Sequence, residues 1–334
     1  MNVKPIIAVT MGDPCGIGPE VVAKALNNPK VTESCCPLVI GNLSMLKAAL
    51  KNIGSSLDLT LTKTFSIPEL NRGTIPILDL ENLDPDTITP GRLSKTAGRA
   101  SMEWVLQAAQ LCIDGSVAAM VTSPINKEAT RMAGYKDIGH QETLQRLTRA
   151  VSVATMLISG TLRVVHLTTH KSLREACNAV TRENVLEKIL LTEKEFRRWG
   201  FTTPRIGVAA LNPHASDGGL IGTEEEFEIY PAVMEAREKG ITVDGPIPAD
   251  IVFHQAIEDK FDVVLAMYHD QGHIPVKVHG FEQSISVNLG LPIIRTSVDH
   301  GTAFDIAGKG IANSLSMEEA ILLATSLASG TTKI

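Results

Sequence analysis

The sequence predicts an α/β protein made of two layered α/β/α domains. Short runs of aliphatic and β-branched residues alternate with amphipathic helical patterns along almost the whole chain, and this alternation is typical of sheets covered by helices. The length of 334 residues corresponds to about two domains. A hydrophobic content of 44% and a charged content of 20% supply enough apolar surface for two cores and exclude a disordered chain.

Nine short apolar runs are predicted to be strands, because turn-forming residues bound them. They are Ile6–Thr10, Pro37–Gly41, Ile75–Asp79, Val117–Thr122, Ala154–Ile158, Arg163–Leu167, Arg205–Ala210, Val263–Met267 and Ile285–Asn288. Three of the intervening helices have recognisable capping or stop residues. They run from Thr181 to Gly200, from Thr223 (with Glu226 in a capping box) to Gly240, and from Ser316 (with Glu319) through Met317–Leu327. No segment resembles a linker, so the chain can cross between the domains more than once.

Charge and composition exclude several classes of function. The net charge is −6, the pI is near 5.9 and no basic tract occurs, which argues against binding to nucleic acid or to a membrane surface. The five cysteines are odd in number and scattered, so reduced thiols are expected and a disulfide frame or structural zinc site is not. No apolar stretch is long enough to span a bilayer, and none has the form of a signal peptide. We therefore expect a cytoplasmic protein.

A glycine-rich turn follows the first predicted strand, in the segment Met11–Glu20. Its backbone N–H groups could hold an anion, and Pro19 suits the first turn of the helix that follows. The spacing matches neither the dinucleotide-binding fingerprint, which fails at Val21, nor a P-loop. On spacing alone, a tight strand-to-helix turn is the favoured interpretation.

Histidines gather at the predicted ends of strands. His170, His214 and His269 each follow an apolar strand, at the edge where open α/β sheets bind ligands, and His140 lies in a Gly-His-Gln-Glu segment. Three imidazoles from three loops suit a divalent ion that keeps positions open for substrate. A single histidine is more often a surface or core residue, and the spacing matches no local metal signature. The three equivalent positions make a metal site a hypothesis to test.

The segment Leu289–Asn313 is polar, rich in glycine and dense in hydrogen-bonding groups. Arg295 within it could bind a phosphate or carboxylate group through two parallel hydrogen bonds. The alternative is an elaborate surface loop, which the density of polar groups makes the weaker interpretation.

Six segments carry a resemblance to a known family. They are Thr10–Glu20, Thr168–His170, Leu211–Ala215, Gly245–Asp250, Ala266–Gly272 and Arg295–Ala303. Together they resemble the 4-hydroxythreonine-4-phosphate dehydrogenase family over essentially the whole chain. The segment His300–Asn313 is also similar to the NAD-binding loop of isopropylmalate and isocitrate dehydrogenases. The resemblance implies their fold, in which the nucleotide site lacks a Rossmann glycine fingerprint.

The resemblance also implies roles for particular residues. It implies that one divalent ion (Zn, Mg, Mn or Co) is held by His170, His214 and His269. It implies substrate binding by His140, Gln141, Lys277, Ser286 and Arg295. It implies NAD binding by His300, Gly301, Thr302, Asp305 and Asn313. Either Asp250 or Lys277 would take the hydroxyl proton. Such enzymes are homodimers that share ligands of the active site between subunits.

Two departures from the family pattern concern the substrate. Gln141 replaces a threonine, and Ser286 replaces an asparagine. Glutamine at the first position resembles the branch that acts on phosphorylated four-carbon sugar acids. The sequence therefore predicts NAD-dependent oxidative decarboxylation of D-threonate or D-erythronate 4-phosphate to dihydroxyacetone phosphate and CO2. The alternatives are 4-hydroxy-L-threonine 4-phosphate, the vitamin B6 precursor, as substrate; a phosphate acyltransferase-like enzyme; or a non-catalytic metabolite-binding protein.

The expected domain division follows from these assignments. Residues 1–125 with 290–334 form the NAD side, and residues 126–289 form the side of the metal site and the dimer interface.

Overall fold

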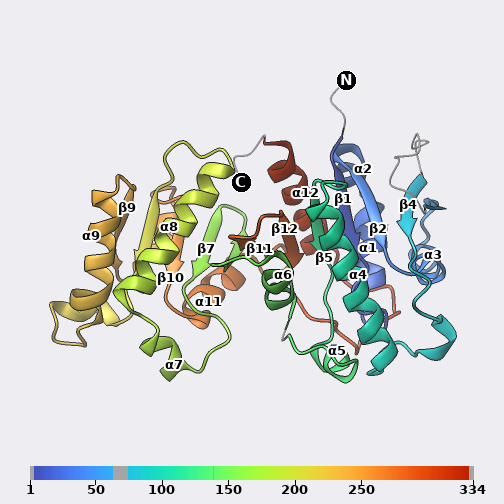
Figure 1. Cartoon of the computed structure of the whole chain (residues 1–334), viewed down its shortest axis with the longest axis horizontal. Coiled ribbons are helices and arrows are strands. Elements are labelled where there is room, and N and C mark those ends of the chain that lie inside the picture. Colours follow the sequence, from blue (N-terminus) through green and yellow to red (C-terminus); the bar gives the residue numbers. More distant parts are fainter. Residues whose placement is uncertain (1–3, 63–73, 138, 331–334) are drawn as a thin grey trace. The chain divides into compact units, whose positions relative to one another are not determined.

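The computed structural model describes residues 4–62, 74–137 and 139–330. The chain forms two compact units (Figure 1). Unit 1 lies within Met1–Ala150 and Leu291–Ser329, and unit 2 comprises mainly Val151–Gly290. Residues 126–150, which the sequence placed with the second domain, belong to unit 1. Among the described residues, no helix has the length and apolar character needed to cross a bilayer.

Unit 1 is built on a parallel sheet. Its strands are β1 (Ile6–Thr10), β2 (Cys36–Ile40), β3 (Asp58–Leu61), β4 (Thr74–Leu78), β5 (Ala119–Thr122) and β12 (Arg295–Val298), in the order β3-β4-β2-β1-β5-β12. The central strand β1 is buried over almost its whole length, because helices cover both faces of the sheet. A continuous apolar run, without polar alternation, is the sequence pattern of such a strand.

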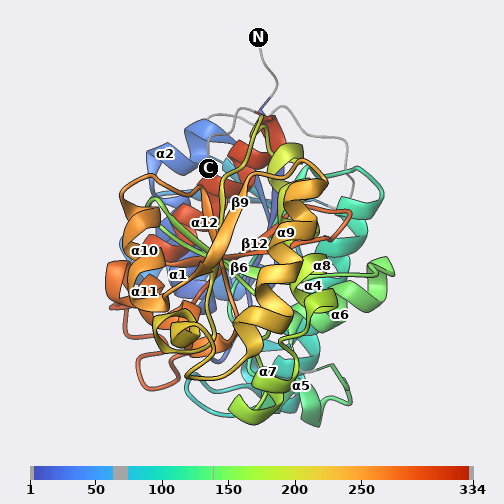
Figure 2. The ribbon, with the colours of Figure 1, turned by 90° about the vertical axis from the view of Figure 1, so that its left-hand side faces the viewer.

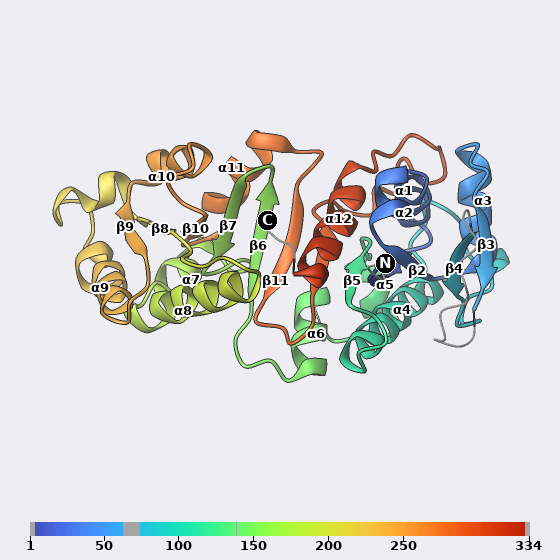
Figure 3. The same ribbon diagram turned by 90° about the horizontal axis from the view of Figure 1, so that it is seen from above.

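The helices of unit 1 form two layers. They are α1 (Gly18–Leu26), α2 (Pro29–Ser34), α3 (Leu43–Asn52), α4 (Lys95–Ile113), α5 (Lys127–Met132), α6 (His140–Thr148) and α12 (Leu315–Ser329), with a 3-10 turn at Pro85–Thr87. Helices α1, α2 and α12 lie over one face and α4 over the other (Figure 3). Trp104 of α4 is fully buried and anchors that layer.

Unit 2 has a mixed sheet. Its strands are β6 (Ala154–Ser159), β7 (Leu162–His166), β8 (Ile206–Ala209), β9 (Val243–Ile247), β10 (Val263–Ala266) and β11 (Ile285–Leu289), in the order β11-β6-β7-β10-β8-β9. The pairs β11–β6 and β6–β7 are antiparallel, whereas β7, β10, β8 and β9 run parallel. Those four parallel strands end at the same edge, and their loops emerge side by side.

The helices of unit 2 also cover both faces of its sheet. They are α7 (Leu173–Asn178), α8 (Arg182–Arg198), α9 (Tyr230–Glu238), α10 (Ala249–Ile257) and α11 (His269–Gly280), with a 3-10 segment at Pro213–Asp217 and a π-helical turn at Glu225–Ile229. Helices α10 and α11 lie on one face and α8 and α9 on the other (Figure 2). The core between sheet and α10–α11 includes Leu157, Val164, Phe253 and Val276.

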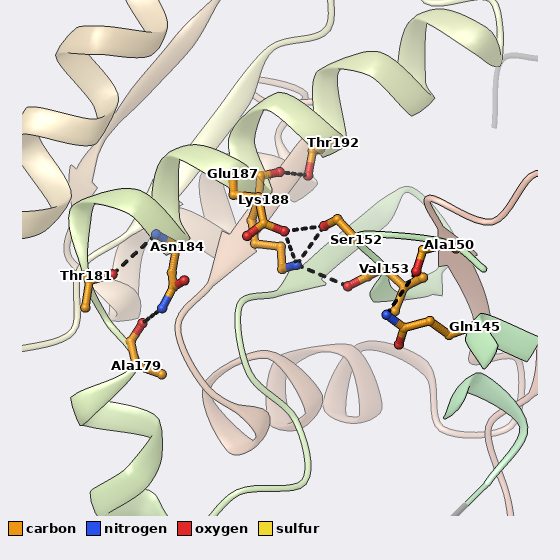
Figure 4. Close-up of polar contacts among 10 residues, drawn as sticks. All are labelled: Gln145, Ala150, Ser152, Val153, Ala179, Thr181, Asn184, Glu187, Lys188 and Thr192. Atoms are coloured by element: carbon orange, nitrogen blue, oxygen red, sulfur yellow. Dashed lines mark hydrogen bonds and ion pairs between the residues drawn. The ribbon is translucent and has the colours of Figure 1, made fainter. Parts of the chain in front are cut away.

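Among the described residues up to Ser329, the chain passes between the units twice, after Ala150 and after Gly290. Beside the first crossing, Lys188 of α8 donates to the Ser152 hydroxyl at 3.2 Å, and that hydroxyl also bonds Glu187 (Figure 4). Gly290 lies beside the second crossing and has a φ of +84°. A Cβ atom at this position would lie 2.0 Å from the Ser152 carbonyl oxygen. Only glycine is compatible with that position.

All nine predicted strands are present, with ends within two residues of the predicted positions. Strands β3, β9 and β12 were not predicted. Strand β3 is mostly exposed, and β9 contains Gly245-Pro246, which disfavours a strand. Strand β12 lies in the polar, glycine-rich segment 289–313, where no apolar run marks a strand.

The helix ends are only partly as predicted. Thr181 caps α8 by accepting the Asn184 N–H at 3.3 Å, which confirms that cap (Figure 4). The capping box of Thr223 and Glu226 is wrong, because a π-helical turn precedes α9 and its N-cap is Glu224, with no side-chain capping bond.

The predicted cap of the last helix is also wrong. Asn313 accepts the Leu315 N–H at 2.9 Å, so the helix starts before Ser316. The Ser316 hydroxyl accepts the Asp299 N–H at 3.3 Å, which ties the helix to the loop after β12.

Candidate active site

Three histidine-bearing loops lie at one edge of the unit 2 sheet. His170 follows β7, His214 follows β8 and His269 follows β10. Because β10 lies between β7 and β8 and all three are parallel, the loops emerge next to one another. This is the edge at which α/β sheets bind ligands.

Two of the three rings lie close to ligating distance. The ring centroids of His170 and His269 are 6.3 Å apart, and two imidazoles that share one zinc ion through nitrogens at about 2.1 Å have centroids about 5–6 Å apart. Within the described residues, no three His, Cys, Asp or Glu side chains are grouped closely enough to bind an ion as they stand. The His214 side chain is 68% exposed, so packing does not fix its ring.

Carboxylates set the orientation of two of these histidines. The Nδ1 atom of His214 lies 3.1 Å from Asp217 Oδ2, and Nδ1 of His269 lies 2.6 Å from Asp270 Oδ1. A ring that donates its Nδ1–H to a carboxylate keeps the lone pair on Nε2, and metal-binding histidines have such partners in most proteins. The chemistry of the donor set therefore fits a divalent metal ion.

The backbone at His214 is strained. His214, Ala215, Ser216 and Asp217 have φ values of 55°, 54°, 71° and 46°, and each non-glycine residue in this left-handed region costs about 1–2 kcal/mol. Strain of this kind persists where surrounding contacts enforce it, and it clusters at functional sites. Glu225 supplies one such contact, because its Oε1 accepts two backbone N–H groups of the preceding loop, at 2.8 Å and 2.7 Å.

Gln271 connects two of the histidine loops. Its Oε1 accepts the Met267 N–H at 2.6 Å beside His269, and its Nε2 donates to the Ala210 carbonyl at 2.7 Å at the end of β8. Thr168 Oγ1 donates to the Met267 carbonyl at 2.9 Å and so joins the third loop. Sequence reasoning missed this role of Gln271. The available signal was an uncharged polar residue two positions after the histidine.

Two further histidines, His273 and His166, pack next to His269. His273 stacks on the His269 ring with centroids 3.6 Å apart, and buried His166 lies 4.6 Å from His273. Burial lowers the pKa of His166 to about 3, so the ring is neutral. A Cβ on Gly272 would lie 2.3 Å from His166 Nε2. The start of α11 is thereby packed against β7.

The other predicted residues of unit 2 are spread over three elements. Lys277 lies on α11, two turns after His269, with Nζ 4.9 Å from the centroid of the Phe281 ring. Ser286 lies on β11 and pairs with β6. Asp250 is exposed near the start of α10.

In unit 1, Arg295 is a buried charge at the start of β12. It is 5% exposed, and its Nε and terminal nitrogen donate to Thr122 Oγ1 at 3.1 Å and 2.6 Å. Burial lowers the pKa of Arg295 to about 9, against the opposing effect of Glu142. The guanidinium is therefore charged at neutral pH, and an anionic ligand would offset the cost of its burial.

His140 and Gln141 form the first turn of α6, close to that charge. Burial, with smaller effects from Arg295 and Lys127, holds the pKa of His140 well below its usual range. The His140 Nε2 atom is buried and has no hydrogen-bond partner among the residues that the structure describes. The first N–H groups of a helix favour anions, so a neutral ring, a helix start and a buried guanidinium together suit a phosphate or carboxylate group.

The predicted NAD-binding residues lie in the loop between β12 and α12. The carbonyl oxygen of Thr302 accepts the Ile17 N–H at 2.9 Å. The Asn313 side chain accepts the Leu315 N–H in the first turn of α12. A cleft of about 820 Å³ lies between α1, α3 and the segment 85–90, and it reaches the loop at Gly308. Asp305 and Asn313 are exposed.

The glycine-rich turn after β1 is a tight turn, as the favoured interpretation held. The backbone N–H groups of Asp13, Cys15, Gly16 and Ile17 all have partners within the protein, so they form no anion cradle. Burial raises the pKa of Asp13 to about 6, against the opposing effect of the Cys15 N–H.

Comparison with known proteins identifies relatives across the whole chain. The family model described as "Pyridoxal phosphate biosynthetic protein PdxA" matches residues 33–324. A protein of Clostridium botulinum strain Hall is 43% identical over 324 residues, which is 97% of each chain, and one of Halalkalibacterium halodurans is 44% identical over 98% of each. Both bear the provisional name D-threonate 4-phosphate dehydrogenase.

Solved structures are similar over the same length. A 4-hydroxythreonine-4-phosphate dehydrogenase of Klebsiella pneumoniae is 41% identical, with a TM-score of 0.90 over 98% of this chain and 99% of that one. One of Burkholderia phymatum is 43% identical, with a TM-score of 0.85 over the same shares. A terephthalate 1,2-cis-dihydrodiol dehydrogenase of Burkholderia xenovorans is 29% identical, with a TM-score of 0.67 over 96% of this chain and 98% of that one.

Proposed function

The chain belongs to the PdxA family, and from that membership we propose that it oxidises D-threonate 4-phosphate, or its epimer D-erythronate 4-phosphate, with NAD and a divalent metal ion. The products are dihydroxyacetone phosphate and CO2. The observation that carries the proposal is the shared name of relatives that are 43–44% identical over 97–98% of both chains. Members of this family are named dehydrogenases, which implies a nicotinamide cofactor.

The proposed reaction has two steps. The C3 hydroxyl gives its hydride to NAD and its proton to a base, for which Asp250 and Lys277 are the candidates. The resulting 3-keto acid then loses CO2 by cleavage of the C1–C2 bond, and the electron pair is stabilised as an enolate before C2 is protonated. A divalent ion held by His170, His214 and His269 would supply Lewis-acid stabilisation of the developing negative charge.

The anionic groups of the substrate need fixed positive charge. We assign this role to Arg295 and Lys277. Neutral His140 adds a hydrogen-bonding group, because its buried Nε2 has no partner among the described residues. An unpaired polar atom inside a protein costs free energy unless a ligand satisfies it. The orphaned nitrogen thus supports a role for His140 in binding.

The second candidate substrate is 4-hydroxy-L-threonine 4-phosphate, which the names of the solved relatives favour. The two acids share the phosphate, the C3 hydroxyl and the carboxylate, and they differ only at C2. An ammonium group at C2 only donates hydrogen bonds, whereas a hydroxyl both donates and accepts. From the family resemblance we take Gln141 to face C2. Its amide offers both roles, which favours the hydroxyl. We therefore propose the sugar acid as the substrate.

Formation of NADH tests the reaction class directly. Purified protein with NAD, a divalent ion and D-threonate 4-phosphate is expected to produce NADH and dihydroxyacetone phosphate in equal amounts. A phosphate acyltransferase or a metabolite-binding protein would produce neither. NADH without dihydroxyacetone phosphate would contradict the decarboxylation step.

We also propose that the protein is a homodimer that associates through α11. Ile274, Val278 and Phe281 are 59%, 82% and 66% exposed, and their spacing places them on one face of the helix. Large apolar side chains grouped in this way mark an association surface. A second copy is the proposed occupant because α11 begins with His269, and the family resemblance implies an active site shared between subunits.

The change Val278→Asp is expected to convert the dimer to monomer in sedimentation velocity experiments, because it buries a charge in an apolar interface. The matched control is Ile113→Asp, at an exposed apolar residue of α4 in unit 1 that is 44% exposed. A wild-type monomer, or a variant that stays dimeric, would contradict the assignment of this surface.

A further inference from the structure

The loop that carries the predicted NAD contacts is held by two charged side chains of α1. Glu20 accepts the N–H groups of Gly310 at 3.0 Å and of Ala312 at 2.6 Å. Lys24 donates to the carbonyl oxygens of the same two residues, at 3.0 Å and 2.6 Å. Four backbone groups of the loop are thereby bonded to two side chains.

Gly310 and Ala312 are two positions apart in the loop, and each presents both its N–H and its C=O group to α1. Glu20 and Lys24 are four residues apart, so they lie one above the other on one face of α1 and can bond both residues at once. Their own charges are 3.1 Å apart, and the Glu20 and Lys24 side chains are only 5% and 24% exposed.

The same contacts fix which side chains of the loop point outward. Ala312 is 2% exposed, whereas Ile311 is 65% exposed and Asn313 is also exposed. Asn52 adds a further anchor by donating to the Gly308 carbonyl at 3.1 Å. Gly308 and Gly310 have φ values of +75° and +72°, and glycines lose the most conformational freedom when a loop is ordered.

We infer that Glu20 and Lys24 are positioning residues for nucleotide binding, which act by ordering the loop at residues 308–313 before NAD arrives. An ordered loop lowers the entropic cost of binding. The inference rests on the proposed function, since it takes the loop as the NAD site. It also gives Glu20, at the end of the glycine-rich turn, a role that anion binding does not provide.

The test measures NADH binding by isothermal titration calorimetry for the wild type, Glu20→Gln, Lys24→Met and Lys24→Arg. Glu20→Gln and Lys24→Met are expected to raise the Kd for NADH by roughly 10-fold, equivalent to about 1.4 kcal/mol. Lys24→Arg keeps the positive charge and the N–H donors, so it is expected to bind NADH within about 3-fold of wild type. In steady-state kinetics, the KM for NAD rises while the KM for the acid stays unchanged.

The control is Glu193→Gln on α8 in unit 2, which removes an ion pair with Arg197 of the same i,i+4 spacing. It is expected to leave NADH binding unchanged. If Glu20→Gln fails to fold, the Lys24 variants decide the question. Wild-type protein that binds no NADH would overturn the proposed function. Wild-type protein that binds NADH while Lys24→Met binds it equally well would overturn this inference alone.

Discussion

Replacing His214 with alanine is expected to remove the bound divalent ion and to lower turnover by roughly 10³-fold, because a Lewis acid contributes several kcal/mol to stabilising the developing charge. The melting temperature is expected to stay close to that of the wild type, since the side chain is 68% exposed. Metal content by elemental analysis and kcat on the same preparation measure both effects.

The left-handed backbone at His214 calls for a second variant. Alanine tolerates a φ of 55° less well than asparagine does, so His214→Asn removes the imidazole with less added strain. The control is His254→Ala, at an exposed position on α10. Undiminished metal content in both His214 variants would contradict the ligand assignment. Lost stability with full activity per folded molecule would identify His214 as a structural residue.

Replacing Arg295 with methionine is expected to raise the KM for the acid substrate by roughly 100-fold, or about 2.8 kcal/mol, because a two-pronged hydrogen bond to an anion is lost. Stability is expected to stay the same or to rise, since methionine removes a charge whose burial is unfavourable, as the lowered pKa of Arg295 indicates. A loss of binding without a loss of stability is the signature of a functional buried charge.

The control for this variant is another arginine with a pKa lowered by burial. Arg163 of β7 donates to the Asp262 carbonyl at 3.1 Å, and burial lowers its pKa as well. Arg163→Met is expected to leave the KM for the acid unchanged. If Arg295→Met leaves the KM for the acid unchanged and raises the KM for NAD, Arg295 binds the nucleotide and not the acid substrate.

Much of the fold could be predicted because its central strands are buried on both faces. A strand such as Ile6–Thr10 is a continuous apolar run between turn residues, and such runs are recognisable without tertiary information. Strand β9 could not be found in this way, because Gly245-Pro246 opposes strand formation and the segment is held extended by pairing with β8, which is a tertiary contact.

In the candidate site, too, locally determined positions could be predicted and long-range contacts could not. The histidines at the ends of β7, β8 and β10 were predictable, because the position after a parallel strand is set by local pattern. The partners that fix them were not. Gln271 joins loops that are about 60 positions apart, and Glu20 bonds Ala312 across 292 positions. Contacts of that range depend on how the strands are ordered in the sheet, and one sequence does not specify that order.

The central claim is that this enzyme acts on a phosphorylated sugar acid, and Gln141 is its most specific support. The measurement that tests it is kcat/KM for D-threonate 4-phosphate, D-erythronate 4-phosphate and 4-hydroxy-L-threonine 4-phosphate, at saturating NAD and metal. An unsatisfied polar group at C2 costs about 1–3 kcal/mol, so a preference of roughly 5- to 150-fold for one of the sugar acids is expected. A clear preference for the amino acid would contradict the account and assign the protein to vitamin B6 synthesis.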